Sequence, residues 1–119
     1  MAFRFLKFPV YTDIKRYIGD VYSFSSKFPK DEQFGLTGQL RRAATSIALN
    51  LAEGSDRGSD QDFKRFIQMA IGSVNETVAI FDLALERGFI SQGNCDIMIT
   101  QAESIVKQLS AFRQALKSR

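Results

Sequence analysis

The chain has 119 residues and a formal net charge of +3, with hydrophobic residues at 45% of positions and charged residues at 24%. This length suits one domain with an ordinary core, and the composition excludes an intrinsically disordered chain. A single cysteine excludes an internal disulfide, and no stretch approaches the roughly 20 apolar residues of a membrane-spanning helix. Because Arg4 and Lys7 interrupt the apolar start of the chain, it does not resemble a signal peptide, and we expect a cytoplasmic protein with no membrane partner.

Glycine-rich stretches at 35–38, 54–58 and 88–93 separate four helix-sized blocks. An aromatic arm, residues 1–11, precedes the first block. This block predicts a helix over Thr12–Lys27, because its apolar residues recur at steps of three and four.

The second block predicts a helix over Thr37–Glu53, with Thr37 as its N-cap and Gly54 just past its end. Polar residues follow one strip of this helix at helical spacing. Its many alanines indicate that neighbouring helices approach it closely on several sides.

The third block predicts a helix over Ser59–Arg87, capped by Ser59 and closed by Gly88. Gly72 interrupts this helix at a cost of about 1 kcal/mol relative to alanine, which indicates a close crossing with the second helix. The fourth block predicts a helix over Ser91–Lys117. Four amphipathic helices joined by short turns predict an all-α fold: an antiparallel up-down-up-down four-helix bundle, as a single domain over residues 1–119.

The sequence contains no histidine, which removes Ser-His and Cys-His catalysis, histidine-ligated zinc and the Glu-x-x-His motif of di-iron bundles. Carboxylates could still hold Mg²⁺ in a hydrolase, but the acids of the third helix do not form a matched pair on one face. The glycine-rich stretch at 54–59 lacks the lysine of a phosphate-binding loop and is interpreted as a helix connection. We therefore expect no enzyme, no metal and no cofactor.

The polar strip of the second helix is interpreted as part of a structural network rather than a ligand site. Buried charges must be paired, and Glu76 on the third helix is the expected partner of Arg41 or Arg42. The network is predicted to comprise Arg41, Arg42, Asn50, Glu53, Arg57 and Glu76.

A second apolar strip on the third helix, Met69, Ile80 and Leu83, exceeds what one core face requires. One interpretation is that this strip and the aromatic arm pack within the chain's own bundle. The other is that Met69, Ile80 and Leu83 form an oligomer interface.

Long stretches of the chain closely resemble a known family. They are Phe28-Pro29-Lys30-Asp31-Glu32-Gln33-Phe34-Gly35-Leu36, Gln39-Leu40-Arg41-Arg42-Ala43-Ala44-Thr45-Ser46-Ile47, Asn50-Leu51-Ala52-Glu53-Gly54, and then Arg57, Phe63, Phe66, Gly72-Ser73, Glu76 and Gly88-Phe89-Ile90. The family is that of four-helix-bundle proteins encoded in intervening sequences of bacterial 23S ribosomal RNA genes. The resemblance is firm over residues 21–90 and implies a closed bundle that assembles as a homopentamer. It extends to accessory variability determinant bundles of retroelements, which engage nucleic acid and a reverse transcriptase.

Two functions follow as hypotheses. The first is a non-enzymatic homo-oligomeric scaffold that binds RNA or DNA, in which five copies would carry a charge of about +15. If the chain ends lie close together, their charges form one basic zone. The residues expected to bind nucleic acid are cations of the two chain ends and of the third helix: Arg4, Lys7, Lys15, Arg16, Lys64 and Arg65, with the basic C-terminus of Lys107, Arg113, Lys117 and Arg119. The second hypothesis is an adaptor that binds a protein partner and no nucleic acid.

Overall fold

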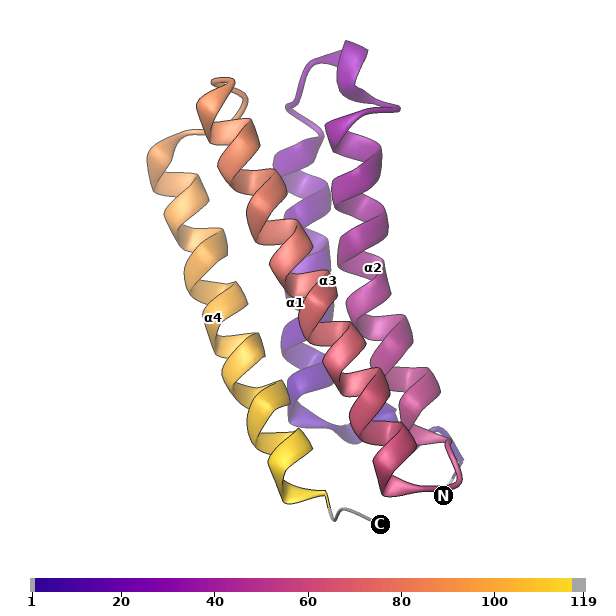
Figure 1. Ribbon diagram of the computed structural model, residues 1–119. Helices are drawn as coiled ribbons and strands as arrows, with labels where there is room; N and C mark the ends of the chain where they lie inside the picture. The colour runs from indigo at the N-terminus through magenta and orange to yellow at the C-terminus, as the bar shows by residue number, and fades with distance from the viewer. Residues whose placement is uncertain (1, 117–119) are drawn as a thin grey trace.

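A computed structural model of the chain describes residues 2–116 (Figure 1). Two short 3-10 helices and four long α-helices account for its regular structure, and the described residues contain no strand. In chain order the elements are η1 (Arg4–Lys7), α1 (Pro9–Ser25), η2 (Lys30–Glu32), α2 (Leu36–Ser55), α3 (Asp60–Glu86) and α4 (Gln92–Ala115). The fold is all-α, as the sequence predicts.

Successive long helices run in opposite directions, so the bundle is antiparallel and up-down-up-down (Figure 1). Each helix packs on its neighbours in the order α1, α2, α3, α4 and back to α1. The side formed by α1 and α2 is therefore opposite the side formed by α3 and α4. We call the end that carries η1, the α2–α3 connection and the last turn of α4 the arm end, and the other the far end.

Local sequence sets most helix boundaries. The Ser59 hydroxyl accepts a hydrogen bond from the Asp62 amide at 3.1 Å, and Ser91 caps α4 in the same way. Gly88 ends α3 with a φ of 76°, a backbone conformation that favours glycine. Both predicted serine caps are confirmed.

Two predicted helix starts are wrong. Proline occupies the first position of α1, where its missing amide is no loss, so α1 starts at Pro9 rather than Thr12 and the arm is shorter than residues 1–11. Thr37 is buried inside α2 rather than capping it. The Glu32 carboxylate instead accepts a hydrogen bond from the Leu36 amide at 3.0 Å.

The apolar stripes of all four helices meet in one core. One buried polar contact crosses it diagonally: the Tyr17 hydroxyl of α1 lies 2.8 Å from the Thr77 hydroxyl of α3. Because Thr77 donates to the Val74 carbonyl at 2.6 Å, it accepts from Tyr17. Burial raises the pKa of Tyr17 to about 12, against the lowering effect of the Thr77 hydrogen bond. This contact fixes the register of α1 against α3 without charge.

The structural roles predicted for two glycines are wrong. Gly54 lies inside α2 and is buried, and a Cβ built there would lie 2.5 Å from the Phe66 Cβ and 2.9 Å from a Phe63 ring atom of α3. Gly72, predicted at a close crossing, is exposed, with nothing within 4 Å of such a Cβ. The close approach of α2 and α3 is thus at Gly54.

No helix in the described part of the chain combines the length and apolar character needed to cross a membrane.

Candidate nucleic-acid interface

The N-terminal arm is fixed to the arm end of the bundle by Arg4. Its guanidinium donates two hydrogen bonds to the Ser55 carbonyl, at 3.1 and 2.9 Å, in the last turn of α2. The same group lies over the Phe8 and Phe63 rings, 5.8 and 5.4 Å from their centroids. Arg4 therefore neutralises the negative end of α2 and joins the arm to α3.

Three phenylalanines close the core at this end. Phe8 lies 5.0 Å from Phe112 and 6.5 Å from Phe63, and Phe63 lies 5.3 Å from Phe112, between ring centroids. They come from the residue before α1, from α3 and from α4. Part of the arm thus packs within its own bundle, while Phe3 and Leu6 stay 70% and 52% exposed.

A chain of ion pairs crosses the α2–α3 connection. Arg57 pairs with Glu53 at 2.9 Å and with Asp62 at 3.4 Å, and Arg65 pairs with Asp62 at 2.9 Å. Arg57 and Arg65 also lie over the buried Phe66 ring, 4.5 and 4.6 Å from its centroid. Two guanidiniums therefore cover Phe66.

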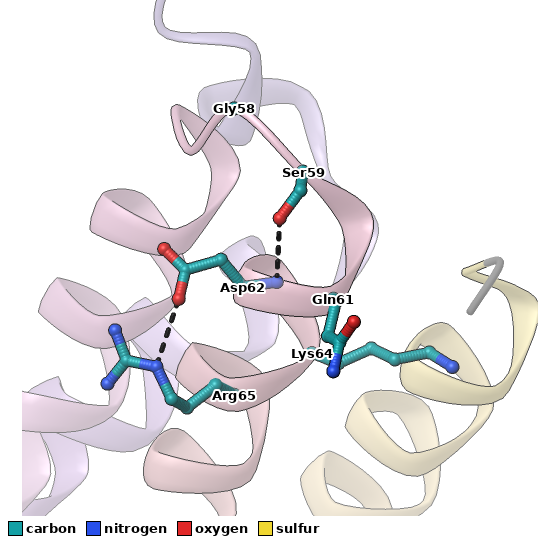
Figure 2. A pocket seen from close by; sticks show the side chains of 6 residues that line it. All are labelled: Gly58, Ser59, Gln61, Asp62, Lys64 and Arg65. Atoms are coloured by element: carbon teal, nitrogen blue, oxygen red, sulfur yellow. Dashed lines mark hydrogen bonds and ion pairs between the residues drawn. The ribbon is translucent and has the colours of Figure 1, made fainter. Parts of the chain in front are cut away.

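Figure 2 shows the hollow at the start of α3, with Asp62 hydrogen-bonded to both Ser59 and Arg65. Lys64 extends from α3 in a different direction from Arg65. The two neighbouring cations predicted to bind nucleic acid together do not converge on one point.

The other cations predicted to bind nucleic acid lie at different distances from the arm end. Lys7 is exposed at the end of η1. Lys15 lies over the Tyr11 ring at 5.2 Å, and Arg16 approaches Asp13 at 3.7 Å. Both cations are on α1, where Lys15 is about 9 Å along the helix from its start.

The basic C-terminal stretch follows α4 toward the arm end. Lys107 is exposed, and Arg113 is half-buried in the last turn of α4. Lys117 and Arg119 lie outside the described residues.

The first described residues and the last turn of α4 lie at the same end of the bundle (Figure 1). The cations brought to the arm end are Arg4, Lys7, Arg57, Lys64, Arg65 and Arg113, and the acids there are Asp13, Glu53, Asp56, Asp60 and Asp62. Cations outnumber acids, so the arm end is basic. The ion pairs of Asp62 were not predicted from the sequence, although its spacing of three from Arg65 is a common ion-pair spacing on helices.

One ion pair of the predicted polar network is confirmed, and another is wrong. Glu53 and Arg57 do pair. Glu76, however, is exposed and forms no ion pair with Arg41 or Arg42 within residues 2–116. Arg41 turns instead toward α1.

Contacts with Tyr22 and Ser25 hold Arg41 against α1, and one hydrogen bond holds Asn50 within α2. The Arg41 guanidinium donates to the Ser25 hydroxyl at 2.9 Å and lies 4.6 Å from the Tyr22 ring centroid. Arg42 points to solvent, and Asn50 donates to the Ser46 carbonyl of its own helix at 2.9 Å. The polar strip does not form one connected network.

The predicted apolar strip of α3 also divides. Met69 and Leu83 are 45% and 52% exposed, whereas Ile80 is 4% exposed and belongs to the chain's own core. Ile80 cannot share an exposed interface with them, because it is buried in the core of its own chain. A role for Met69 and Leu83 in assembly stays a prediction.

Within residues 2–116, no group of His, Cys, Asp and Glu side chains is arranged to hold a metal ion.

Residues 7–111 match the family described as 23S rRNA-intervening sequence protein. The chain belongs to this family. The match reaches into all four long helices and begins after Arg4, so the residue that fixes the arm of this family member to Ser55 lies outside the matched region.

Among solved structures, the family member is similar to a protein of unknown function from the S23 ribosomal protein family of Bacteroides thetaiotaomicron VPI-5482. The TM-score is 0.81 at 20% sequence identity, over 89% of this chain and 99% of that chain. At this identity the likeness supports the fold alone. A search of curated proteins found no match.

Proposed function

We propose that this family member is a non-enzymatic, homo-oligomeric scaffold of the cytoplasm that binds nucleic acid, with RNA as the first candidate. The binding surface is the basic arm end of the bundle. The assembly is a pentamer, by resemblance to related bundles.

One observation carries this proposal: the arm folds back onto the end where α3 starts and α4 finishes. Cations from three distant parts of the chain thereby gather on one surface. An oligomer repeats that surface and strengthens its field, which favours a polyanion.

The cations of this surface differ in what else they do. Arg4, Arg57 and Arg65 hold the arm and the α2–α3 connection in place, so substituting them would also change the fold. Lys7 is exposed at the end of η1, and Lys64 extends away from Arg65 (Figure 2). Lys7 and Lys64 are the two predicted nucleic-acid contacts chosen for substitution in a test of phosphate contacts.

The test is fluorescence anisotropy of the purified protein with a structured RNA and a single-stranded DNA, at low and at physiological salt. Binding that weakens steeply with salt is expected, and the slope gives the number of phosphates neutralised. The double variant Lys7→Glu and Lys64→Glu should weaken binding to every sequence. It should reduce the salt slope by roughly one for each phosphate that the protein no longer neutralises.

The matched control is Lys27→Glu with Lys30→Glu. It makes the same change of charge with exposed lysines at the far end of the bundle (Figure 1). Equal losses in both double variants would mean that only net charge matters and would contradict a site at the arm end. Absence of binding to either nucleic acid at low salt would reject the proposal and favour the adaptor hypothesis.

A specific observation supports that adaptor as the second candidate. The exposed Phe3 and Leu49 help to line an open hollow of about 670 Å³ between the arm and α2. An exposed apolar hollow of this kind suits a protein partner.

A further inference from the structure

The α1–α2 side of the bundle combines positive charge with exposed apolar groups. On α1, Asp13 and Asp20 accept hydrogen bonds from glutamines of α4, so the strip of Lys15 and Tyr22 faces the other way, toward α2. Tyr22 contacts Arg41 of α2 and is 44% exposed.

Leu49 continues this side toward the arm end. It is 67% exposed and lies beside the arm, which packs on both α1 and α2. The nearby carboxylate of Glu53 is paired with Arg57. Arg4 and Arg57 line the same hollow with Glu53 and Asp56, so their charges balance, and the positive charge of the α1–α2 side comes from Lys15 and Arg41.

The opposite side has a groove and negative charge. An open groove of about 420 Å³ runs between α3 and α4, with Val78, Ile99 and Val106 as apolar walls and Glu103 and Lys107 on its rim.

Further along this groove, toward the far end, two exposed acids add to the charge. Asp82 of α3 and Asp96 of α4 both lie near enough to the buried Cys95 to raise its pKa, after the larger effect of burial. Three carboxylates thus accompany Lys107 over this part of the α3–α4 side, whereas Lys64 and Arg113 add positive charge nearer the arm end (Figure 2).

We propose that copies of this chain assemble head to tail, with the basic α1–α2 side of one copy seated on the acidic α3–α4 groove of the next. This rests on the homo-oligomer of the proposed function and assigns its two contact surfaces. Charge complementarity selects a second copy as the occupant, because the chain itself presents the matching surface on its opposite side. A two-fold contact of either side with itself would bring like charges together.

The dimensions permit such an interface. The bundle measures 46 × 23 × 21 Å, so one side offers roughly 1,000 Å², which exceeds the roughly 800 Å² per partner of a stable interface. A contact between two different sides continues from copy to copy. It closes into a ring when the rotation per copy divides a full turn.

The experiment uses two exposed substitutions, one on each side. Leu49→Asp places a negative charge against the acidic groove of the next copy, and Glu103→Lys places a positive charge against its basic side. Native mass spectrometry and light scattering of each variant should show monomers where the unsubstituted chain shows larger assemblies. Mixing the two variants should restore complexes of two or more chains, because each keeps one intact side.

The matched control is Glu76→Lys, the same charge change on α3. Glu76 lies about 100° around the helix from Asn75, which lines the groove, and should leave the assembly intact. Circular dichroism checks that every variant is folded.

Assembly that persists in either folded variant would overturn the proposal, and so would a mixture that stays monomeric. The two proposals fail separately. A monomeric chain that binds RNA would reject the head-to-tail contact alone, and an assembled chain that binds no RNA would reject the nucleic-acid function alone.

Discussion

Gly54 and Gly72 provide a paired test of how α2 and α3 pack. Both lie inside helices, so alanine at either position gains about 1 kcal/mol of helix propensity. They differ in what a Cβ would meet. At Gly54 it would lie 2.5 Å from the Phe66 Cβ, and at Gly72 it would meet nothing within 4 Å.

The contact at Gly54 cannot be relieved by a rotamer change, because a Cβ is fixed to its backbone. Either α3 moves away from α2, or the buried Phe66 is compressed. Overpacking of this kind costs roughly 1–3 kcal/mol, and this distance is well below ordinary contact. Taking the upper end of that range, about 3 kcal/mol, and subtracting the propensity gain of about 1 kcal/mol, we expect Gly54→Ala to lower the free energy of unfolding by about 2 kcal/mol.

The exposed Gly72→Ala should raise the free energy of unfolding by about 1 kcal/mol. Urea denaturation followed by far-UV circular dichroism measures both changes, and the slope of the transition checks that the unfolded states are comparable. Two stabilised variants of similar magnitude would refute the close approach of α2 to α3 at Gly54.

Three further outcomes are expected. Tyr17→Phe should cost about 1 kcal/mol at neutral pH, because the variant lacks one buried hydrogen bond to Thr77. Since the pKa of Tyr17 rises from 10.0 to about 12 on folding, its stabilisation is complete below pH 10 and is lost between pH 10 and 12. The difference in stability between the parent chain and Tyr17→Phe should change by up to about 3 kcal/mol across that interval, and a constant difference would argue against burial of the hydroxyl. Arg4→Met should release the arm from Ser55, which would be seen as faster tryptic cleavage after Lys7. Unchanged cleavage there would contradict the role of the Arg4 hydrogen bonds to Ser55 in holding the arm. Cys95 is buried, and burial raises its pKa, so it should react with a thiol reagent only upon unfolding; rapid labelling of the folded chain would contradict this placement.

Local signals in the sequence are reliable where one residue decides the outcome. Ser59 and Ser91 cap the helices they were predicted to cap, and Gly88 has the left-handed conformation that ends α3. Helical periodicity also places the core correctly, since stripes such as Met98, Ala102 and Ile105 are buried. Each of these depends on residues a few positions apart.

The errors concern which neighbour covers which part of a helix. Ile80 lies close to Met69 and Leu83 on a helical wheel, but the packing of α3 against its neighbours buries Ile80 and leaves the other two exposed. The charge of Glu76 predicted an ion pair with Arg41 or Arg42. Arg41 instead contacts a tyrosine ring and a serine hydroxyl of α1. The rotation of each helix about its axis decides which neighbour covers a side chain. No short stretch of the sequence determines that rotation.

The candidate site was predictable only as a set of cations. That the two chain ends share one end of the bundle follows from an even number of antiparallel helices. That Arg4 turns inward to Ser55, leaving Lys7 exposed, depends on the path of a few arm residues. The two contact surfaces of the head-to-tail proposal could not be predicted from the sequence, because they depend on the order in which the helices pack around the bundle.

The ring cluster that closes the arm end can form only late in the synthesis of the chain. Phe8 leaves the ribosome early, but its ring partner Phe112 is made about a hundred residues later. At the usual rate of roughly 5–20 residues per second, the arm waits about 5–20 s for the residue that completes its contact. During that time Phe8 is an exposed apolar group of the nascent chain, open to chaperones or to the growing chains of neighbouring ribosomes. The cluster of three rings is complete only when α4 has been made.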